Sequence, residues 1–177
     1  MQRSGAQFDE KRLIWMNGQH IRLLSVDSLF ERVTNFWPES AKTADENYKK
    51  QILKLIQDRL KTLVDLPTMT DYFFAEPIIN WSMIEENNQL SKLDKDEIFR
   101  LVSTSKEVLE KSEFNAESLQ QTLNNLLELT GQKPAILFSL IRLVVSWAPF
   151  SPALNETLAA IGKDRTIKRL DAVINCL

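Results

Sequence analysis

Cysteine, histidine and long apolar runs are scarce in this chain of 177 residues, and each scarcity excludes a class of protein. The only cysteine, Cys176, cannot form an internal disulfide, which indicates a reducing, cytoplasmic setting. The only histidine, His20, has no partners at metal-ligand spacing, and the chain has no glycine-rich phosphate loop. No apolar run reaches the ~18 residues of a membrane span. The sequence therefore contains no pattern of an active site, a metal centre or a membrane-spanning helix.

Glycine, proline and strand patterns are scarce as well. The chain has four glycines and six prolines, and Val, Ile and Thr do not alternate with polar residues. Apolar residues make up 44% of the chain and charged residues 26%, which is typical of a folded globular protein. We therefore predict an all-α fold, a helical bundle or α-helix cage of two small subdomains. The first residues, MQRSGAQFDEKR, contain no apolar signal region, and we expect an artificial start or the stub of a longer chain.

Charge is distributed unevenly along the chain. The net charge of −2 argues against non-specific binding to nucleic acid. Between Ile84 and Gly131 there are ten acidic and five basic residues, so the rest of the chain carries a small positive excess. We expect any nucleic-acid surface to avoid this acidic middle.

Capping residues and prolines divide the chain into a series of predicted helices. The expected pieces are 8–16, ended by Asn17-Gly18; 25–37, capped by Ser25; a long helix opened by a capping box at 43–46 and continuing to about 65, with Pro67 beyond it; 71–74, closed by Pro77; 94–111; 115–131; 134–147; and two last helices separated by Gly162, the first with Ser151 as N-cap and Pro152 at position N1.

Arg59 stands out on the helix predicted to end near Asp65. At ~100° per residue, it falls about 20° from Ile52, inside the sector of apolar residues. An arginine on a core-facing stripe must extend to solvent, pair with an acid or meet a ligand. On these residues alone a structural arginine is favoured, and a ligand-binding role stays open.

Arg142 is the only charged residue between Lys133 and Glu156. It shares one narrow polar face of an apolar helix with Ser139 and Ser146. A planar guanidinium in such a face suits a base edge or a phosphate. An arginine that only marks the wet side of a buried helix is the alternative, and both interpretations stay open.

Ser151, Pro152 and Leu154 begin the next predicted helix. The first amides of a helix can form a site for an anion or a base edge. An ordinary helix cap is the simpler interpretation of the same residues.

Four segments, in the same order along the chain, resemble the C-terminal part of bacterial glutamyl-tRNA synthetases, which are class I aminoacyl-tRNA synthetases. They are LIWMNGQHIR (13–22), LIQDRLKTLVDLP (55–67) with the following Tyr72-Phe73-Phe74, GQKPAILFSLIR (131–142) and SPALNETLAAIGKDR (151–165). The HIGH and KMSKS signatures of that family's catalytic domain are missing. The resemblance therefore implies an anticodon-binding part that is inactive alone and holds no cofactor or metal, with ATP and magnesium expected only in a catalytic domain outside this chain.

The resemblance also implies domain limits and site residues. It implies the end of a stem-contact region over 1–24 and two helical anticodon-binding subdomains over 25–112 and 113–177. Arg59 matches an arginine that contacts the third anticodon base, and Arg142 matches the arginine of a later apolar helix. Ser151, Pro152 and Leu154 match a segment whose backbone meets the first two bases.

The chain departs from the family near the end of the apolar helix. Many relatives have Leu-Thr-Gly where this chain has Val145-Ser146-Trp147, and Leu140-Ile141 replace the more usual Pro-Leu before the arginine. These departures concern the loop from Trp147 to Phe150.

The resemblance implies tRNA anticodon recognition as part of a glutamate–tRNA ligase in translation. The expected partner is the tRNA for glutamate, with the tRNA for glutamine left open as a second one. We expect a cytoplasmic monomer that binds neither DNA nor a membrane. The alternative is a helical protein-interaction domain with no RNA role, and a free-standing enzyme lacks any candidate site.

Overall fold

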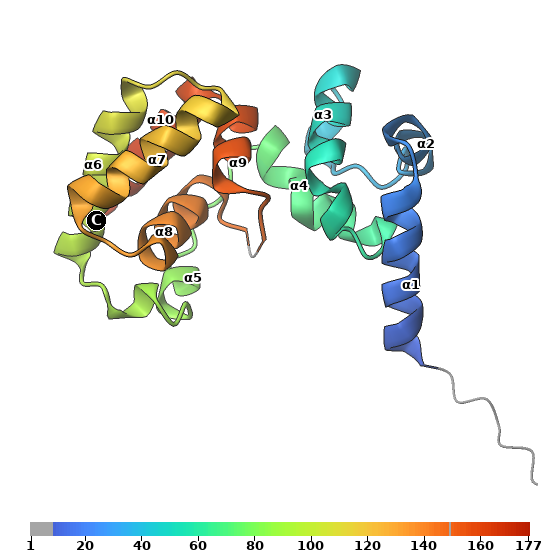
Figure 1. Cartoon of the computed structure of the whole chain (residues 1–177), viewed down its shortest axis with the longest axis horizontal. Helices are drawn as coiled ribbons and strands as arrows, with labels where there is room; N and C mark the ends of the chain where they lie inside the picture. Colours follow the sequence, from blue (N-terminus) through green and yellow to red (C-terminus); the bar gives the residue numbers. More distant parts are fainter. Residues whose placement is uncertain (1–8, 149) are drawn as a thin grey trace, which may run out of the picture. The chain divides into compact units, whose positions relative to one another are not determined.

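The computed structural model describes residues 9–148 and 150–177 (Figure 1). Over these ranges the chain forms helices and turns and no strand, which confirms the predicted all-α fold. None of the described helices is long and apolar enough to cross a membrane. The chain divides into two compact units, and the limit after Thr70 falls inside helix α4. The predicted subdomains 25–112 and 113–177 are a different, functional division, which stays a prediction.

The first unit is built around the ends of three helices. Seven fully or nearly fully buried apolar side chains form its core, and they come from α1, α2, α3 and the turns that follow α2 and α3: Ile21, Leu29, Val33, Leu53, Ile56, Leu60 and Leu66. The elements are α1 (Glu10–Leu23), α2 (Val26–Arg32), η1 (Glu39–Ala41), α3 (Glu46–Ile56), η2 (Gln57–Arg59), η3 (Leu63–Asp65) and the start of α4 (Leu66–Phe74).

The second unit surrounds the most apolar helix, α8 (Pro134–Ser146). This helix packs against each of the other long helices of the unit, as its nearly unbroken apolar sequence requires. Helix α6 also packs against α7 and α10, and α7 against α9. The remaining elements are α5 (Ser82–Glu85), η4 (Leu90–Lys92), α6 (Lys95–Glu110), α7 (Ala116–Thr130), α9 (Leu154–Ile161) and α10 (Lys163–Ile174).

Helix ends that are determined by local capping agree with the sequence. The side chains of Ser25, Asp94 and Asn115 accept hydrogen bonds from backbone amides three residues further on. Gly131 takes the left-handed conformation after α7, at φ 66°. The helices predicted over 94–111, 115–131 and 134–147 are confirmed to within a residue or two.

The prediction that Asn17-Gly18 ends the first helix is wrong. Helix α1 continues through Gly18 to Leu23. Gly18 is buried, and a Cβ built on it would lie 3.4 Å from the carbonyl oxygen of Leu60. The glycine therefore permits close packing of two backbone segments, and its conformational freedom is not used. Residue 8, the predicted start, lies outside the described residues.

Two further helices end earlier than predicted. Helix α2 ends at Arg32 instead of reaching position 37, and the hydroxyl of Thr34 bonds to the carbonyls of Phe30 and Glu31 just beyond its end. Such side-chain bonds compete with helix propagation. Helix α3 is capped by Asp45, not by Thr43, and ends at Ile56, where the chain tightens into η2. Pro67 lies in the first turn of α4, which includes the predicted piece 71–74.

Candidate functional site

Arg59 lies on the surface of the first unit, in the 3-10 turn η2. The predicted stripe is broken there because α3 ends at Ile56, so Ile52 and Leu60 stay in the core while Arg59 turns outward. Its guanidinium forms no hydrogen bond or ion pair with the residues that the structure describes. The expectation of an arginine paired with an acid is therefore wrong for the described residues, while an arginine that extends to solvent agrees with the structure and leaves its donors available to a ligand.

The turn that carries Arg59 is held by α1. Asn17 donates from Nδ2 to the carbonyl of Lys61 at 2.6 Å, and Arg22 donates from Nε to the carbonyl of Asp58 at 2.9 Å. The side chain of Gln57 is buried and donates to the carbonyls at the end of α1. The backbone on both sides of the exposed arginine is thus fixed.

Arg142 is half-buried in the second unit and lines an open hollow. Ser139 lines the same hollow, as predicted, but Ser146 does not lie on that face. Ser146 is buried, and its hydroxyl donates to the carbonyl of Arg142 at 2.8 Å. Glu86 also lines the hollow. A carboxylate in the same hollow as the guanidinium disfavours a phosphate and favours a base edge with both donors and acceptors.

Ser151, Pro152 and Leu154 have buried side chains. The predicted capping role of Ser151 is wrong, because α9 begins at Leu154 with Ala153 as its N-cap. The hydroxyl of Ser151 instead faces the carbonyl of Pro152 at 3.3 Å. These three residues are buried as whole residues, and Ala153 between them is exposed, so this segment can be reached from outside at Ala153.

Phe150 precedes this segment and was not selected from the sequence. Its side chain is 63% exposed, which is unusual for a phenylalanine in a folded chain. An exposed aromatic ring beside a backbone segment suits stacking on an unpaired base. Its position between Pro149 and Pro152 in the sequence was the signal that could have identified it.

Trp147 ends α8 in the left-handed conformation, at φ 43°. Only a few residue types adopt this conformation readily, and glycine is the usual one. The ring of Trp147 contacts that of Trp81 edge to face, with centroids 5.8 Å apart. Trp147 therefore occupies, at the position where many relatives have glycine, a backbone conformation that glycine adopts most readily.

A cluster that contains Arg165 and Arg169 could not be predicted from the sequence, because the groups that these arginines contact are distant in sequence. Arg169 is only 4% exposed and donates to the carbonyls of Val145, Tyr72 and Ala75. Arg165 donates to the carbonyl of Phe73 at 2.6 Å. The N–H groups of these arginines already donate to backbone carbonyls at the ends of α4 and α8. We therefore assign the cluster to stabilisation of the fold.

Glu76 completes this cluster by accepting from both arginines, at 3.1 Å from Arg165 and 3.3 Å from Arg169. Burial alone raises the pKa of Glu76, but the hydrogen bonds from Arg169 and Arg165 outweigh it and leave the pKa below its ordinary value. The carboxylate is therefore ionised wherever the chain is folded near neutral pH.

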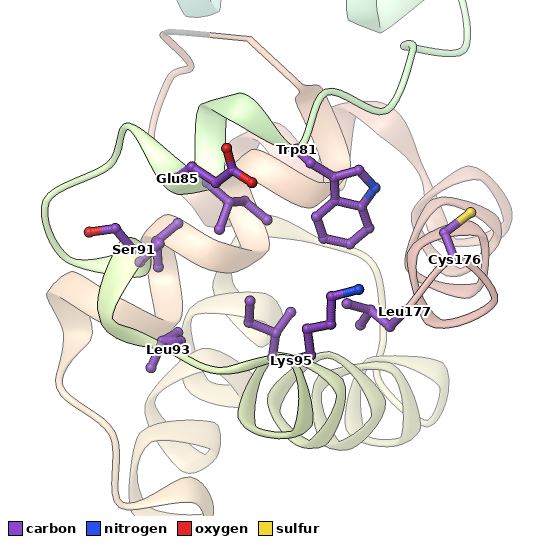
Figure 2. A pocket seen from close by; sticks show the side chains of 10 residues that line it. Trp81, Glu85, Ser91, Leu93, Lys95, Cys176 and Leu177 are labelled. Carbon is purple, nitrogen blue, oxygen red and sulfur yellow. The ribbon is translucent and has the colours of Figure 1, made fainter.

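A pocket of about 450 Å³ in the second unit contains none of the predicted site residues. Figure 2 shows Trp81 and Lys95 entering it from opposite sides, with Cys176 at the rim. Its lining is mostly apolar, and no catalytic arrangement of side chains is present there. Within the described ranges, no group of three His, Cys, Asp or Glu residues could hold a metal ion.

Comparison with known proteins assigns the chain to a family. Residues 28–174 match the family described as the anticodon binding domain, so the chain belongs to that family. The chain is also similar to glutamate–tRNA ligases. It is 29% identical over 186 residues to the enzyme of Chloroherpeton thalassium, covering 99% of this chain and 36% of that one. It is 30% identical over 187 residues to the enzyme of Roseiflexus castenholzii, covering 100% and 36%.

The fold agrees with a solved glutamate tRNA ligase from Elizabethkingia meningosepticum. The TM-score is 0.81 at 21% identity, over 98% of this chain and 34% of that one, which supports the fold alone. The chain spans about a third of the length of the curated relatives that it matches. The resemblance to the glutamyl-tRNA synthetases, inferred from four short segments, is confirmed.

Proposed function

We propose that this chain is the tRNA anticodon-binding part of a glutamate–tRNA ligase. The observation that carries the proposal is the match of residues 28–174 to the anticodon-binding family. Its partner is the tRNA for glutamate, its setting the cytoplasm, and its own role positioning and selection of tRNA. ATP and magnesium act in a catalytic domain of the longer enzyme, and this part needs neither.

Arg59 supplies the first contact in this proposal. Anticodon bases lie in a single-stranded loop, where they can be turned outward and recognised by their edges. An exposed guanidinium on a fixed turn can donate to an acceptor such as the O2 carbonyl of cytosine. We assign the third anticodon base to Arg59, which accounts for a preference for the glutamate tRNA over the glutamine tRNA.

The second unit supplies the remaining contacts. We assign contacts with the first two bases to the backbone of Ser151, Pro152 and Leu154, a segment that is exposed at Ala153 and buried at the other three residues. Arg142 offers a guanidinium in a hollow that Glu86 also lines, a combination suited to a base edge. Phe150 offers a ring for stacking.

The alternative, a protein-interaction domain, is favoured by one observation. Leu13, Trp15 and Met16 on α1 are all more than 40% exposed, and Trp15 is 63% exposed. An apolar protein interface depends little on salt, whereas RNA binding weakens steeply because counterions are released. Salt dependence therefore distinguishes the two functions.

The test is binding of an RNA stem-loop with the glutamate anticodon to the purified chain. If binding neutralises about three phosphates of a single-stranded loop, affinity falls roughly twentyfold between 50 and 200 mM salt. Arg142→Ala should weaken binding by about 1–3 kcal/mol, since a charged hydrogen bond is lost. Arg100→Ala, which removes an arginine paired with Glu97 on α6, is the control and should change little.

Absence of binding, or equal affinity for a stem-loop with a scrambled anticodon, would overturn the proposed function. Normal folding with unchanged affinity in Arg142→Ala would remove only that residue from the site.

A further inference from the structure

We propose that the last turns of α1 position Arg59 for base recognition. This inference rests on the proposed function and extends it to residues that no comparison assigns to RNA. The segment of α1 concerned is 17–24, and the segment it holds is 57–61, here called the arginine turn. The two are about forty residues apart in sequence and in direct contact.

The first contact is a close approach of two backbones. A Cβ on Gly18 would lie 3.4 Å from the carbonyl oxygen of Leu60 and 3.5 Å from the Cα of Lys61. These distances are ordinary van der Waals contacts, so the two backbones approach to within the space of one methyl group. The neighbouring Asn17 uses this proximity, because its Nδ2 donates to the carbonyl of Lys61 at 2.6 Å.

The second contact is an exchange of hydrogen bonds between the two segments. Arg22 donates to the carbonyl of Asp58, while Gln57 donates to the carbonyls of Ile21 at 2.9 Å and Leu24 at 2.8 Å. The last carbonyls of a helix lack their usual helical partners. The Ile21 carbonyl accepts from the amide of Leu24, and Gln57 adds a second bond to it and a bond to the Leu24 carbonyl. Each segment thereby fixes the backbone of the other.

These contacts leave the side chain of Arg59 as the movable part of the turn. Asp58 is held on one side and Lys61 on the other, and Leu60 between them is fully buried. A backbone fixed before binding spares the entropy of ordering it in the complex. It also fixes where the guanidinium can reach, which determines which base edge it can distinguish.

A purely structural role fits these contacts less well. The core of the unit already joins α1 to α3 through Ile21, Leu53 and Ile56. Asn17 and Arg22 are both exposed, so their bonds add little to that core. Both bonds end on backbone carbonyls within two residues of Arg59, where they affect the geometry of the turn.

The experiment compares two stem-loops that differ only at the third anticodon base, cytosine or guanine. For the wild-type chain we expect an affinity ratio of about tenfold or more. Arg59→Ala should give the lowest affinity ratio. In Arg22→Ala and Asn17→Ala the logarithm of the affinity ratio should fall at least halfway from the wild-type value to the Arg59→Ala value. The melting temperature should change little. Arg22→Lys keeps a donor for the Asp58 carbonyl and should restore most of the ratio.

A second measurement does not depend on RNA. The amide of Leu60 bonds to the carbonyls of Ile56 and Gln57, so its hydrogen exchange reports the order of the arginine turn. It should exchange several-fold faster in Arg22→Ala, while amides in the middle of α3 keep their rates. Asn35→Ala, at an exposed position after α2, is the control and should alter neither measurement.

The two measurements distinguish a failure of the proposed function from a failure of the positioning role. If the wild-type chain binds neither stem-loop, the proposed function fails, and the positioning role falls with it. If the wild-type chain distinguishes them but Arg22→Ala and Asn17→Ala keep the full ratio, only the positioning role is overturned. Unchanged exchange of the Leu60 amide in both variants also overturns it, and a loss of affinity shared equally by both stem-loops would assign the contacts to stability.

Discussion

At the scale of single residues, the arginines of this chain differ in what their guanidinium groups contact. Arg165 and Arg169 are occupied by backbone carbonyls and by Glu76. Arg22 bonds to the turn beside it through Nε. Arg59 forms no side-chain hydrogen bond or ion pair within the described residues, although it follows Asp58 in the same short turn. A guanidinium whose donors face solvent on a fixed backbone is the one suited to an external acceptor.

The residue that determines choice of tRNA in this proposal is Arg59. Arg59→Gln should narrow the preference for the glutamate over the glutamine anticodon stem-loop by about 1–3 kcal/mol, since one good base contact is lost. Competition binding with stem-loops that differ at the third base measures it. Because the side chain is exposed, the melting temperature should stay nearly unchanged.

Arg32→Gln, also exposed and in the same unit, is the matched control and should keep the preference. A lowered melting temperature with an unchanged preference in Arg59→Gln would return this residue to a structural role.

Trp147 allows a test of backbone strain at a single position. Trp147→Gly and Trp147→Ala both lose the ring contact with Trp81, but only alanine keeps a Cβ at φ 43°. Trp147→Gly should therefore be the more stable of the two by about 1 kcal/mol, measured by denaturant unfolding.

The same pair of substitutions at Glu128, on the exposed surface of α7, should give the opposite order, because alanine favours a helix over glycine by about 1 kcal/mol. The same order at both positions would contradict a left-handed cap at Trp147.

At the scale of helices, the second unit contains a junction of helix ends. Arg169 from α10 donates to carbonyls at the end of α4 and of α8, and Glu76 balances its charge. Positive charge at the C-terminal end of a helix is favourable because the last carbonyls carry partial negative charge. This junction fixes the end of α8, where the turn at Trp147 begins.

Acid should weaken this junction through Glu76. A carboxylate whose pKa is lower in the folded chain than in the unfolded one contributes stability above the unfolded pKa, and the contribution is lost as pH falls through the folded pKa. The stability difference between the wild-type chain and Glu76→Gln should therefore be constant from pH 8 to about 6 and shrink below the ordinary value of 4.5.

Unfolding curves at several pH values measure this difference. Glu128→Gln, which removes an exposed carboxylate of α7 outside any described ion pair, should show no such trend. A difference for Glu76→Gln that persisted at pH 3 would exclude the ionised carboxylate as its source.

Local and distant determinants explain which elements the sequence could predict. The limits of α6 and α7 depend on capping by Asp94, Asn115 and Gly131, all within a few residues of the helices they end. The end of α3 depends on Gln57, whose partners belong to α1, more than thirty residues away. The pattern of apolar residues continued past that point, so it predicted a helix that tertiary contacts interrupt.

The same difference applies to the candidate site. Arg59, Arg142 and the 151–154 segment were found from charge, isolation and resemblance, which the sequence displays directly. The exposure of Arg59 and the burial of Ser151 were not predictable, because each depends on where a helix ends. The contacts of Asn17 and Gly18 with the arginine turn were not predicted, because an Asn-Gly pair more commonly ends a helix.

At the scale of the whole molecule, the candidate residues are divided between the two units. Arg59 belongs to the first unit, and Arg142, Ser151, Pro152 and Leu154 to the second. The limit between the units lies within α4, so the chain passes from one set of contacts to the other without a long linker. Recognition of the whole anticodon in this proposal requires both units in one chain.

The chain by itself should not charge tRNA. It spans about a third of the length of the matched ligases and lacks the HIGH and KMSKS signatures. Glutamate-dependent pyrophosphate exchange by the pure chain should equal that of a boiled sample, and a full-length ligase from a relative is the positive control. Pyrophosphate exchange above this background would show that the chain has an active site of its own.

The close packing of α1 against the arginine turn has a consequence for exchanging parts between relatives. Asn17 and Arg22 of α1 bond to the carbonyls of Lys61 and Asp58, on either side of Arg59. A turn grafted from a relative with another anticodon preference would meet a helix shaped for a different neighbour. The smallest transplantable piece is therefore discontinuous, and the two segments should be inherited together, so that a change at one position is accompanied by a change at the other.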